Sequence, residues 1–150
     1  MVKIDKILFP SDLREHSAKI LPYVLSMSEK YNSTIYLLHV IDEISKWGGF
    51  YNPHISLDLY QKDGMQTAEK FMDMVCEQQM KGCSNFERKI LSGDPAAEIL
   101  KTIDSEAIDL VVMGTHGHKG LEHAIFGSVA EKVVKNSPVP VLTNNPYKLI

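Results

Sequence analysis

Hydrophobic residues along this chain occur in short continuous runs, and the runs alternate with longer segments of helical periodicity. The runs are rich in β-branched and aliphatic residues, as is typical of strands buried in a sheet. They predict strands at residues 4–10, 34–41, 86–91, 110–113 and 139–142. Between them, apolar residues recur every three or four positions and predict helices at residues 14–31, 57–81 and 95–103, and after Gly127-Ser128. This alternation predicts an α/β fold in which one open parallel sheet of five strands carries helices on both faces.

Prolines modify two of these helices. Pro22 lies inside the first helix, where it removes a hydrogen bond and presses on the carbonyl four residues back, so we expect a kink or a late helix start. Asp94 followed by Pro95 predicts a capping residue with proline at the first helical position. Residues 42–56 form a long loop with aromatic residues between Trp47 and Tyr51, which could cover a ligand or pack on one another.

Composition narrows the functional class. The length of 150 residues predicts a single domain spanning residues 1–150. A formal net charge of -3 does not favour binding to nucleic acid or to an anionic membrane. No apolar run approaches the roughly 20 residues that span a bilayer, and the first residues lack a signal-peptide core, so we expect a cytoplasmic protein. Cys76 and Cys83 lack zinc-ligand spacing, which favours reduced thiols.

The segment from Leu110 to Leu142 carries the candidate chemistry. A buried strand ends at Gly114, Gly117 follows in a polar loop, and Gly127-Ser128 opens a helix. Glycines allow backbone N–H groups to approach a ligand, and a helix N-terminus attracts phosphate. A tight turn with a helix cap would also use these glycines. The spacing matches neither the dinucleotide-binding fingerprint nor a P-loop.

The spacing Gly114-x2-Gly117-x9-Gly127-Ser128, followed by Pro138-Val139-Pro140-Val141, resembles the nucleotide-binding signature of the universal stress protein family. The resemblance covers essentially the whole chain. It implies a Rossmann-like sheet with strand order 3-2-1-4-5, which puts the carboxyl ends of strands 1 and 4 side by side. Ligands of such sheets bind in the crevice at that point. The resemblance therefore implies that ATP, or ADP or AMP, binds between the two strand ends.

Backbone groups are expected to bind the phosphates, and the Ser128 hydroxyl can add a hydrogen bond. By resemblance, Asp12 lies near the ribose while Pro10, Ser11 and Val40 flank the adenine, although Asp12 could equally cap the following helix. The candidate nucleotide-binding residues are Pro10, Ser11, Asp12, Val40, Met113, Gly114, His116, Gly117, His118, Gly127, Ser128 and Val129.

The histidines near the glycine loop, His116, His118 and His123, invite a metal interpretation. They lack a matching Asp, Glu or Cys, so we expect no dedicated metal site, while Mg²⁺ or Mn²⁺ could be held through the phosphates. His118 stands where many family members have Arg or Lys, which could make phosphate affinity weaker and sensitive to pH. For His39 and His16 we expect ordinary satisfaction in the core or at the surface.

The leading hypothesis is a stress-response regulatory protein that binds an adenine nucleotide and acts as a switch or a dimer module. A slow ATP hydrolase and a nucleotide-free dimeric scaffold remain the alternatives. No catalytic residue is apparent and no Walker-type lysine is present, so any hydrolysis is expected to be slow. The resemblance also implies a homodimer through the last strand, from Val139 to Leu142, because a strand at the edge of a sheet can pair with another chain.

Overall fold

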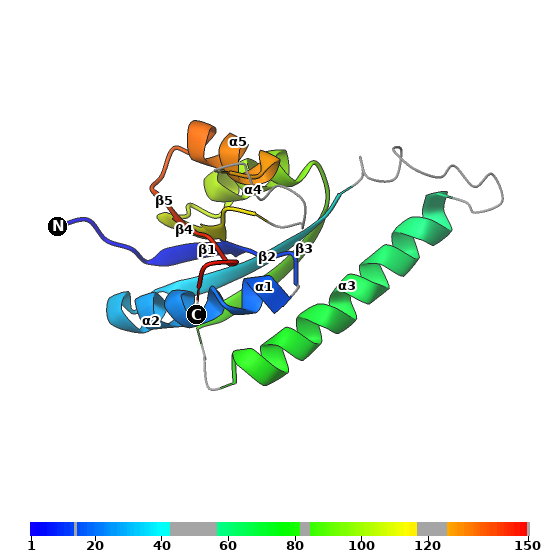
Figure 1. The fold of residues 1–150 in the computed structure, drawn as a ribbon, viewed down its shortest axis with the longest axis horizontal. Coiled ribbons are helices and arrows are strands. Elements are labelled where there is room, and N and C mark those ends of the chain that lie inside the picture. Colours follow the sequence, from blue (N-terminus) through cyan, green and yellow to red (C-terminus); the bar gives the residue numbers. More distant parts are fainter. Residues whose placement is uncertain (14, 43–56, 82–84, 117–125, 150) are drawn as a thin grey trace.

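The computed structural model describes residues 1–13, 15–42, 57–81, 85–116 and 126–149. The predicted loop at residues 43–56 therefore lies outside the described residues, as do Cys83, Gly117, His118 and His123. The described residues contain both strand ends and the helix start that the sequence assigns to the candidate site. They form the sheet and the two helical layers shown in Figure 1.

The sheet is parallel throughout and has the order β3-β2-β1-β4-β5, which confirms the predicted class and strand order. Its strands are β1 (Lys6–Pro10), β2 (Thr34–Asp42), β3 (Phe86–Gly93), β4 (Leu110–Gly114) and β5 (Val141–Asn144). The middle strands are the most apolar because helices cover both of their faces. Ile7, Leu8 and Phe9 of β1 are each at most 2% exposed.

Successive residues of β1 point to opposite faces of the sheet and so enter two separate cores. Phe9 packs on one side with residues of α2 (Leu21–Tyr31) and α3 (Leu57–Gln79). Leu8 packs on the other side with residues of α4 (Pro95–Ser105) and α5 (Ser128–Asn136). Figure 1 shows these two helical layers on either side of the strands. The carboxyl edge of the sheet is consequently bordered by helix ends from both layers.

The helix starts follow the proline signals. The segment predicted as one helix is divided into α1 (Glu15–Ala18) and α2, and Pro22 lies in the first turn of α2, so the predicted interruption is confirmed. In α4, the Asp94 carboxylate accepts a hydrogen bond from the Ala97 N–H at 3.0 Å, as expected of an N-cap, and Pro95 is the first helical residue. Both prolines lie where a missing N–H costs no intrahelical bond.

The last strand was predicted at residues 139–142, and the structure corrects this to Val141–Asn144. Pro138 and Pro140 cannot donate to a neighbouring strand, so regular pairing starts after them. The Pro140 carbonyl still accepts from the Val111 N–H at 3.0 Å, and pairing then runs from Val141 to Asn144 along β4. The polar residues Thr143 and Asn144 therefore belong to the strand. The other predicted bounds differ from the structure by a few residues at most.

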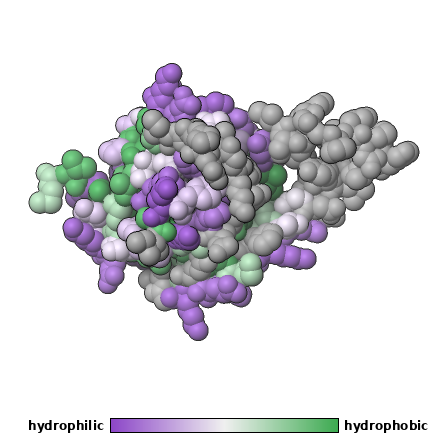
Figure 2. Space-filling model, viewed as in Figure 1, coloured by the Kyte–Doolittle hydropathy of each residue, from purple (hydrophilic) through white to green (hydrophobic). Residues whose placement is uncertain are grey.

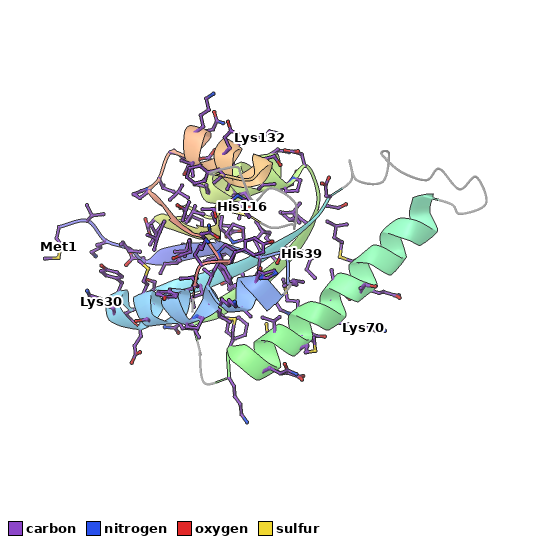
Figure 3. All side chains as sticks on the ribbon, in the orientation of Figure 1. Met1, Lys30, His39, Lys70, His116 and Lys132 are labelled. Atoms are coloured by element: carbon purple, nitrogen blue, oxygen red, sulfur yellow. The ribbon has the colours of Figure 1, made fainter. Side chains whose placement is uncertain are left out.

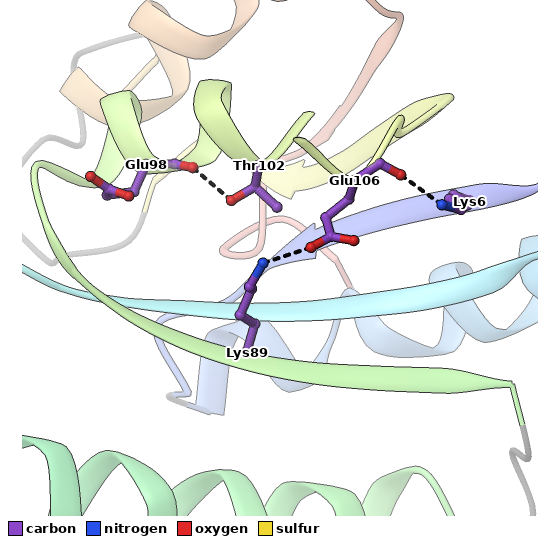
Figure 4. Close-up of polar contacts among 5 residues, drawn as sticks. All are labelled: Lys6, Lys89, Glu98, Thr102 and Glu106. Atoms are coloured by element: carbon purple, nitrogen blue, oxygen red, sulfur yellow. Dashed lines mark hydrogen bonds and ion pairs between the residues drawn. The ribbon is translucent and has the colours of Figure 1, made fainter. Parts of the chain in front are cut away.

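Charged groups attach the end of α4 to the sheet. The Lys6 ammonium donates to the Glu106 carbonyl at 2.7 Å, and the Lys89 ammonium contacts a Glu106 carboxylate oxygen at 2.7 Å (Figure 4). The hydrogen bond from Lys89 holds the pKa of the Glu106 carboxyl below its usual value.

Hydrophilic residues are prominent on the face seen in Figure 2, and the N-terminal end at its left is hydrophobic. None of the described helices is long and apolar enough to cross a bilayer.

Candidate functional site

The candidate site lies where β1 and β4 end side by side. The two strands pair in parallel, with Ile7 opposite Leu110 and Leu8 opposite Val111. The segments that follow them, residues 10–12 and 114–116, therefore leave the sheet at the same edge. Figure 3 labels His39 and His116, which lie toward this edge, whereas Met1 and Lys30 lie toward the other end of the molecule. The sheet thus brings the residues that follow β1 next to those that follow β4. The sequence analysis had proposed that both groups bind the same ligand.

The turn after β1 is anchored to β2 through Ser11. The Ser11 N–H donates to the Leu38 carbonyl at 2.8 Å, and the Ser11 carbonyl accepts from the His39 Nδ1 at 2.9 Å. The Ser11 hydroxyl in turn accepts from the Leu13 N–H at 3.0 Å. Leu13 has a φ of 61°, a left-handed conformation that is costly for a bulky residue and requires such support. The turn after β1 is therefore held in one conformation by these hydrogen bonds.

His39 is a residue for which sequence reasoning gave only a structural role, and that expectation is confirmed by its bond to Ser11. His39 immediately precedes Val40 in β2, so the residue that holds the Ser11 turn is next to a residue that is expected to contact the adenine. Pro10 pairs with Leu38, so Val40 extends two residues past the end of β1 at the same edge. His39 thus fixes the distance between the two segments that are expected to flank the adenine.

Asp12 directly follows this anchored serine. Its carboxylate accepts a hydrogen bond from the Ser17 hydroxyl in α1, which ties the carboxylate to the short helix that follows. Both roles considered for Asp12, support of the helix and contact with a ligand, are compatible with this position, because a carboxylate has several acceptor sites. The Ser17 bond also holds the carboxylate in one orientation.

Backbone hydrogen bonds join the end of β4 to the start of α5. The Gly127 N–H donates to the Thr115 carbonyl at 2.6 Å, and the Thr115 N–H donates to the Asn144 carbonyl at 2.8 Å. A Cβ placed on Gly127 would lie 3.1 Å from the Thr115 carbonyl oxygen and 3.7 Å from the His116 Cα. Glycine is therefore required by close approach of two backbone segments, and not by a left-handed conformation.

The start of α5 has the geometry of an anion site. Gly127 is its N-cap and has no side chain that could cap the helix, while Ser128 at the first helical position is exposed. The first N–H groups of a helix have no intrahelical acceptor, and the helix dipole adds positive potential there. The Ser128 and Val129 N–H groups occupy these positions. They lie beside the end of β4 because Gly127 is bonded to Thr115.

We call the backbone contact between the end of β4 and the start of α5 the joint. Two residues next to this joint, His116 and Met113, are buried. His116 is 9% exposed, and its Nδ1 lies 2.8 Å from the Thr115 hydroxyl. The Tyr147 ring approaches the His116 ring edge-on, with a centroid separation of 6.3 Å. Met113 is 5% exposed, and its side chain is part of the core formed with residues of α4 and α5. The sequence analysis did not identify Tyr147. Residues 145–149 have no helical or strand periodicity, so nothing in the sequence indicated that Tyr147 contacts His116.

No cluster of three or more His, Cys, Asp or Glu side chains suited to a metal ion occurs within residues 1–13, 15–42, 57–81, 85–116 and 126–149. His118 and His123 lie outside these residues, so the expectation of no dedicated metal site stays a prediction. The described residues include the start of α5, whose first N–H groups would suit an anion, and the Asp12 carboxylate. These two features suit a ligand that carries phosphate and hydroxyl groups.

Known proteins of similar sequence and structure identify the family of this chain. Residues 3–143 match the model of the universal stress protein family. The chain belongs to this family. It is 31% identical over 140 residues to the universal stress protein MJ0531 of Methanocaldococcus jannaschii, a match that covers 91% of this chain and 79% of that protein. The structure of the hypothetical protein MJ0577 superposes with a TM-score of 0.75 at 30% identity, covering 96% of this chain and 97% of that one.

More distant structures of this universal stress protein fold were solved with nucleotides. A universal stress protein in complex with cAMP has a TM-score of 0.61 at 16% identity and covers 97% of this chain and 99% of that one. The universal stress protein from Archaeoglobus fulgidus in complex with dAMP has a TM-score of 0.64 at 15% identity and covers 95% of this chain and 98% of that one. At such identities the likeness concerns the fold.

Proposed function

We propose that this universal stress protein binds an adenine nucleotide, ATP in the first instance, between the ends of β1 and β4, and that it acts as a nucleotide-dependent regulatory switch or dimer module. The observation that carries the proposal is the bond from the Gly127 N–H to the Thr115 carbonyl, which holds the start of α5 against the end of β4. Nucleotide complexes of two proteins with this fold, one with cAMP and one with dAMP, support an adenine ligand.

Each part of the ligand has a matching part of the site. The phosphates lie at the Gly114 backbone and the N–H groups of Ser128 and Val129, where the helix start favours negative charge. The ribose hydroxyls donate to the Asp12 carboxylate, and the adenine edge bonds to the backbone of the Ser11 turn and of Val40. Gly117 and His118 remain candidates on the phosphate side. Mg²⁺ or Mn²⁺, if it binds, is held mainly by the phosphate oxygens.

Regulation is favoured over catalysis because phosphoryl transfer needs cations that neutralise the transferred phosphate and a group that positions the nucleophile. The phosphate half of the site is built from backbone N–H groups, which suit binding. A slow ATP hydrolase on the same fold is the second candidate, and phosphate release that grows linearly with time and depends on Asp12 and Ser128 would favour it.

The test is to denature purified protein by heat and to identify released nucleotides by chromatography and mass spectrometry, followed by calorimetric titration of nucleotide-free protein with ATP and Mg²⁺. We expect recovery of ATP and loss of affinity in Asp12→Asn and Ser128→Ala. The matched control is Ser26→Ala, since Ser26 is an exposed serine of α2. An empty supernatant together with no heat of binding would refute the proposal and leave the scaffold alternative.

The dimer is part of the proposal. β5 is an edge strand, and its Leu142 is 41% exposed. Leu142→Lys places a charge on the predicted interface and should give a monomeric mass in light scattering at micromolar concentration, whereas wild type gives a dimeric mass. The control Met74→Lys changes a residue of α3 that is 43% exposed and should remain dimeric. A monomeric wild type would contradict the dimer.

A further inference from the structure

The C-terminal residues after β5 form a compact turn that returns to the sheet. The Asn145 side-chain oxygen accepts from the Tyr147 N–H at 3.1 Å, and the Asn145 carbonyl accepts from the Lys148 and Leu149 N–H groups at 3.1 and 3.3 Å. Pro146 is buried, and Leu149 packs against the core beneath α2. We call residues 145–149 the C-terminal turn.

The C-terminal turn contacts the candidate site at two points. Pro146 Cγ lies 3.7 Å from the position that a Cβ on Gly114 would occupy, so the proline lies beside Gly114 at the end of β4, where Ile20 Cδ1 is nearer at 3.1 Å. The Tyr147 ring lies 4.5 Å from the His16 ring and 6.3 Å from the His116 ring, measured between centroids. His16 belongs to α1 and His116 follows β4. Tyr147 therefore bridges the two chain segments that leave the sheet at the site.

A continuous series of contacts links Tyr147 to the start of α5. The His116 ring that Tyr147 approaches is bonded through Nδ1 to the Thr115 hydroxyl at 2.8 Å. The Thr115 carbonyl accepts from the Gly127 N–H at 2.6 Å, and the Thr115 N–H donates to the Asn144 carbonyl, immediately before the C-terminal turn. The position of the turn therefore affects Thr115 from both sides, and Thr115 sets the position of α5.

We propose that the C-terminal turn is a positioning element of the nucleotide site and that Tyr147 is its positioning residue, acting through His116 on the phosphate-binding start of α5. The inference rests on the proposed function, since it assigns a role within that site. The Ser11 turn on the adenine side is held by the Leu38 carbonyl and the His39 ring and not by the C-terminal turn. In α1 the C-terminal turn contacts His16, whereas the residue bonded to Asp12 is Ser17. Loss of Tyr147 therefore weakens phosphate binding selectively.

The first measurement compares ATP with adenosine, which lacks the phosphates, by calorimetric titration of wild type, Tyr147→Ala and Tyr147→Phe. We expect Tyr147→Ala to raise the Kd for ATP about tenfold, a change equivalent to about 1.4 kcal/mol, and to leave the Kd for adenosine unchanged. Tyr147→Phe keeps the ring and should bind ATP as wild type does. The matched control is Tyr31→Ala, since Tyr31 is 43% exposed and Tyr147 is 40% exposed.

Equal ATP affinity in Tyr147→Ala and wild type would overturn the inference, as would an equal loss for ATP and adenosine. A second measurement needs no nucleotide: hydrogen exchange at the Gly127 amide should be faster in Tyr147→Ala than in wild type and unchanged in Tyr147→Phe. Should the alanine variant fail to fold, Tyr147→Leu replaces it in both measurements. If wild type binds no nucleotide, the proposed function fails, and unchanged exchange at Gly127 would then overturn the positioning role separately.

Discussion

Adding one methyl group at Gly127 tests whether the joint between β4 and α5 is as tight as the structure has it. In Gly127→Ala, the new Cβ would lie 3.1 Å from the Thr115 carbonyl oxygen, which is tighter than nine in ten such contacts and involves backbone on both sides. The backbone angles of Gly127, φ -70° and ψ 167°, are open to any residue, so the substitution introduces no torsional strain. Its effect therefore comes from the contact alone.

The size of the effect follows from two opposing terms. Overfilling a packed position costs about 1–3 kcal/mol, and here relief of the contact also lengthens the 2.6 Å bond from the Gly127 N–H. Replacing glycine by alanine stabilises by about 0.4–1 kcal/mol through the unfolded chain. We expect a net loss of roughly 1 kcal/mol, which corresponds to a fall in Tm of about 2–4 °C for a domain near this size.

Binding should suffer more than stability. A shift of α5 displaces the Ser128 and Val129 N–H groups from the phosphate, and a hydrogen bond to a charged group is worth about 1.5–3 kcal/mol. Loss of one such bond raises the Kd for ATP about ten- to a hundredfold. Calorimetry and thermal denaturation of nucleotide-free protein measure the two quantities on the same sample.

The matched control is Gly64→Ala in α3. Among the described residues, a Cβ there would meet the Ile41 Cγ2 at 3.9 Å, an ordinary contact distance, so the methyl group meets no clash with them. Because glycine weakens a helix interior, we expect Gly64→Ala to raise stability by about 0.5–1 kcal/mol and to leave ATP affinity unchanged. If Gly127→Ala instead bound ATP as wild type does and unfolded at a higher temperature, the joint would not position the phosphate site and the reasoning would be wrong.

Two further predictions concern the scaffold. Asp94→Ala removes the acceptor of the Ala97 N–H at the start of α4, and urea denaturation should show a loss of about 1 kcal/mol. The same change at Asp104, exposed in the last turn of α4, should show no loss, and equal losses would contradict the capping role. Burial raises the pKa of the Cys76 thiol above its ordinary value, although the nearby Arg88 acts in the opposite direction, so the alkylation rate of Cys76 should reach half-maximum at a higher pH than that of an unfolded cysteine peptide. A lower midpoint would contradict this.

The elements of this fold could be predicted from sequence because each is marked by local physics. Buried strands such as β1 are short apolar runs, and the start of α4 is marked by Asp94 and Pro95, whose effects extend only a few residues. The last strand was misplaced because its pairing depends on which N–H groups the prolines remove and on a carbonyl bonded to Val111, a residue far away in the chain. The bounds of a strand depend on the neighbouring strand with which it pairs, and the periodicity of the sequence does not identify that strand.

The candidate site was harder to predict than the elements. The proximity of Asp12 and Gly114 depends on β1 lying next to β4, which came from resemblance to the family and not from the hydrophobic pattern. The spacing of the glycines indicated where backbones approach, and Gly127 does approach Thr115 closely. Nothing in the sequence connected Tyr147 with His16 and His116, because aromatic contacts between distant segments leave no periodic signal.

These observations explain where the site should be sensitive to change. On the phosphate side most of the ligand-binding groups belong to the backbone, so affinity there depends on where the start of α5 lies. Both the Cβ added in Gly127→Ala and the ring removed in Tyr147→Ala should displace it. On the adenine side the turn is held by side chains, and His39, through its bond to Ser11, is the support whose loss should matter most. Substitutions that displace the start of α5 should therefore impair the phosphate half of the site, and loss of the side chains that hold the Ser11 turn should impair the adenine half.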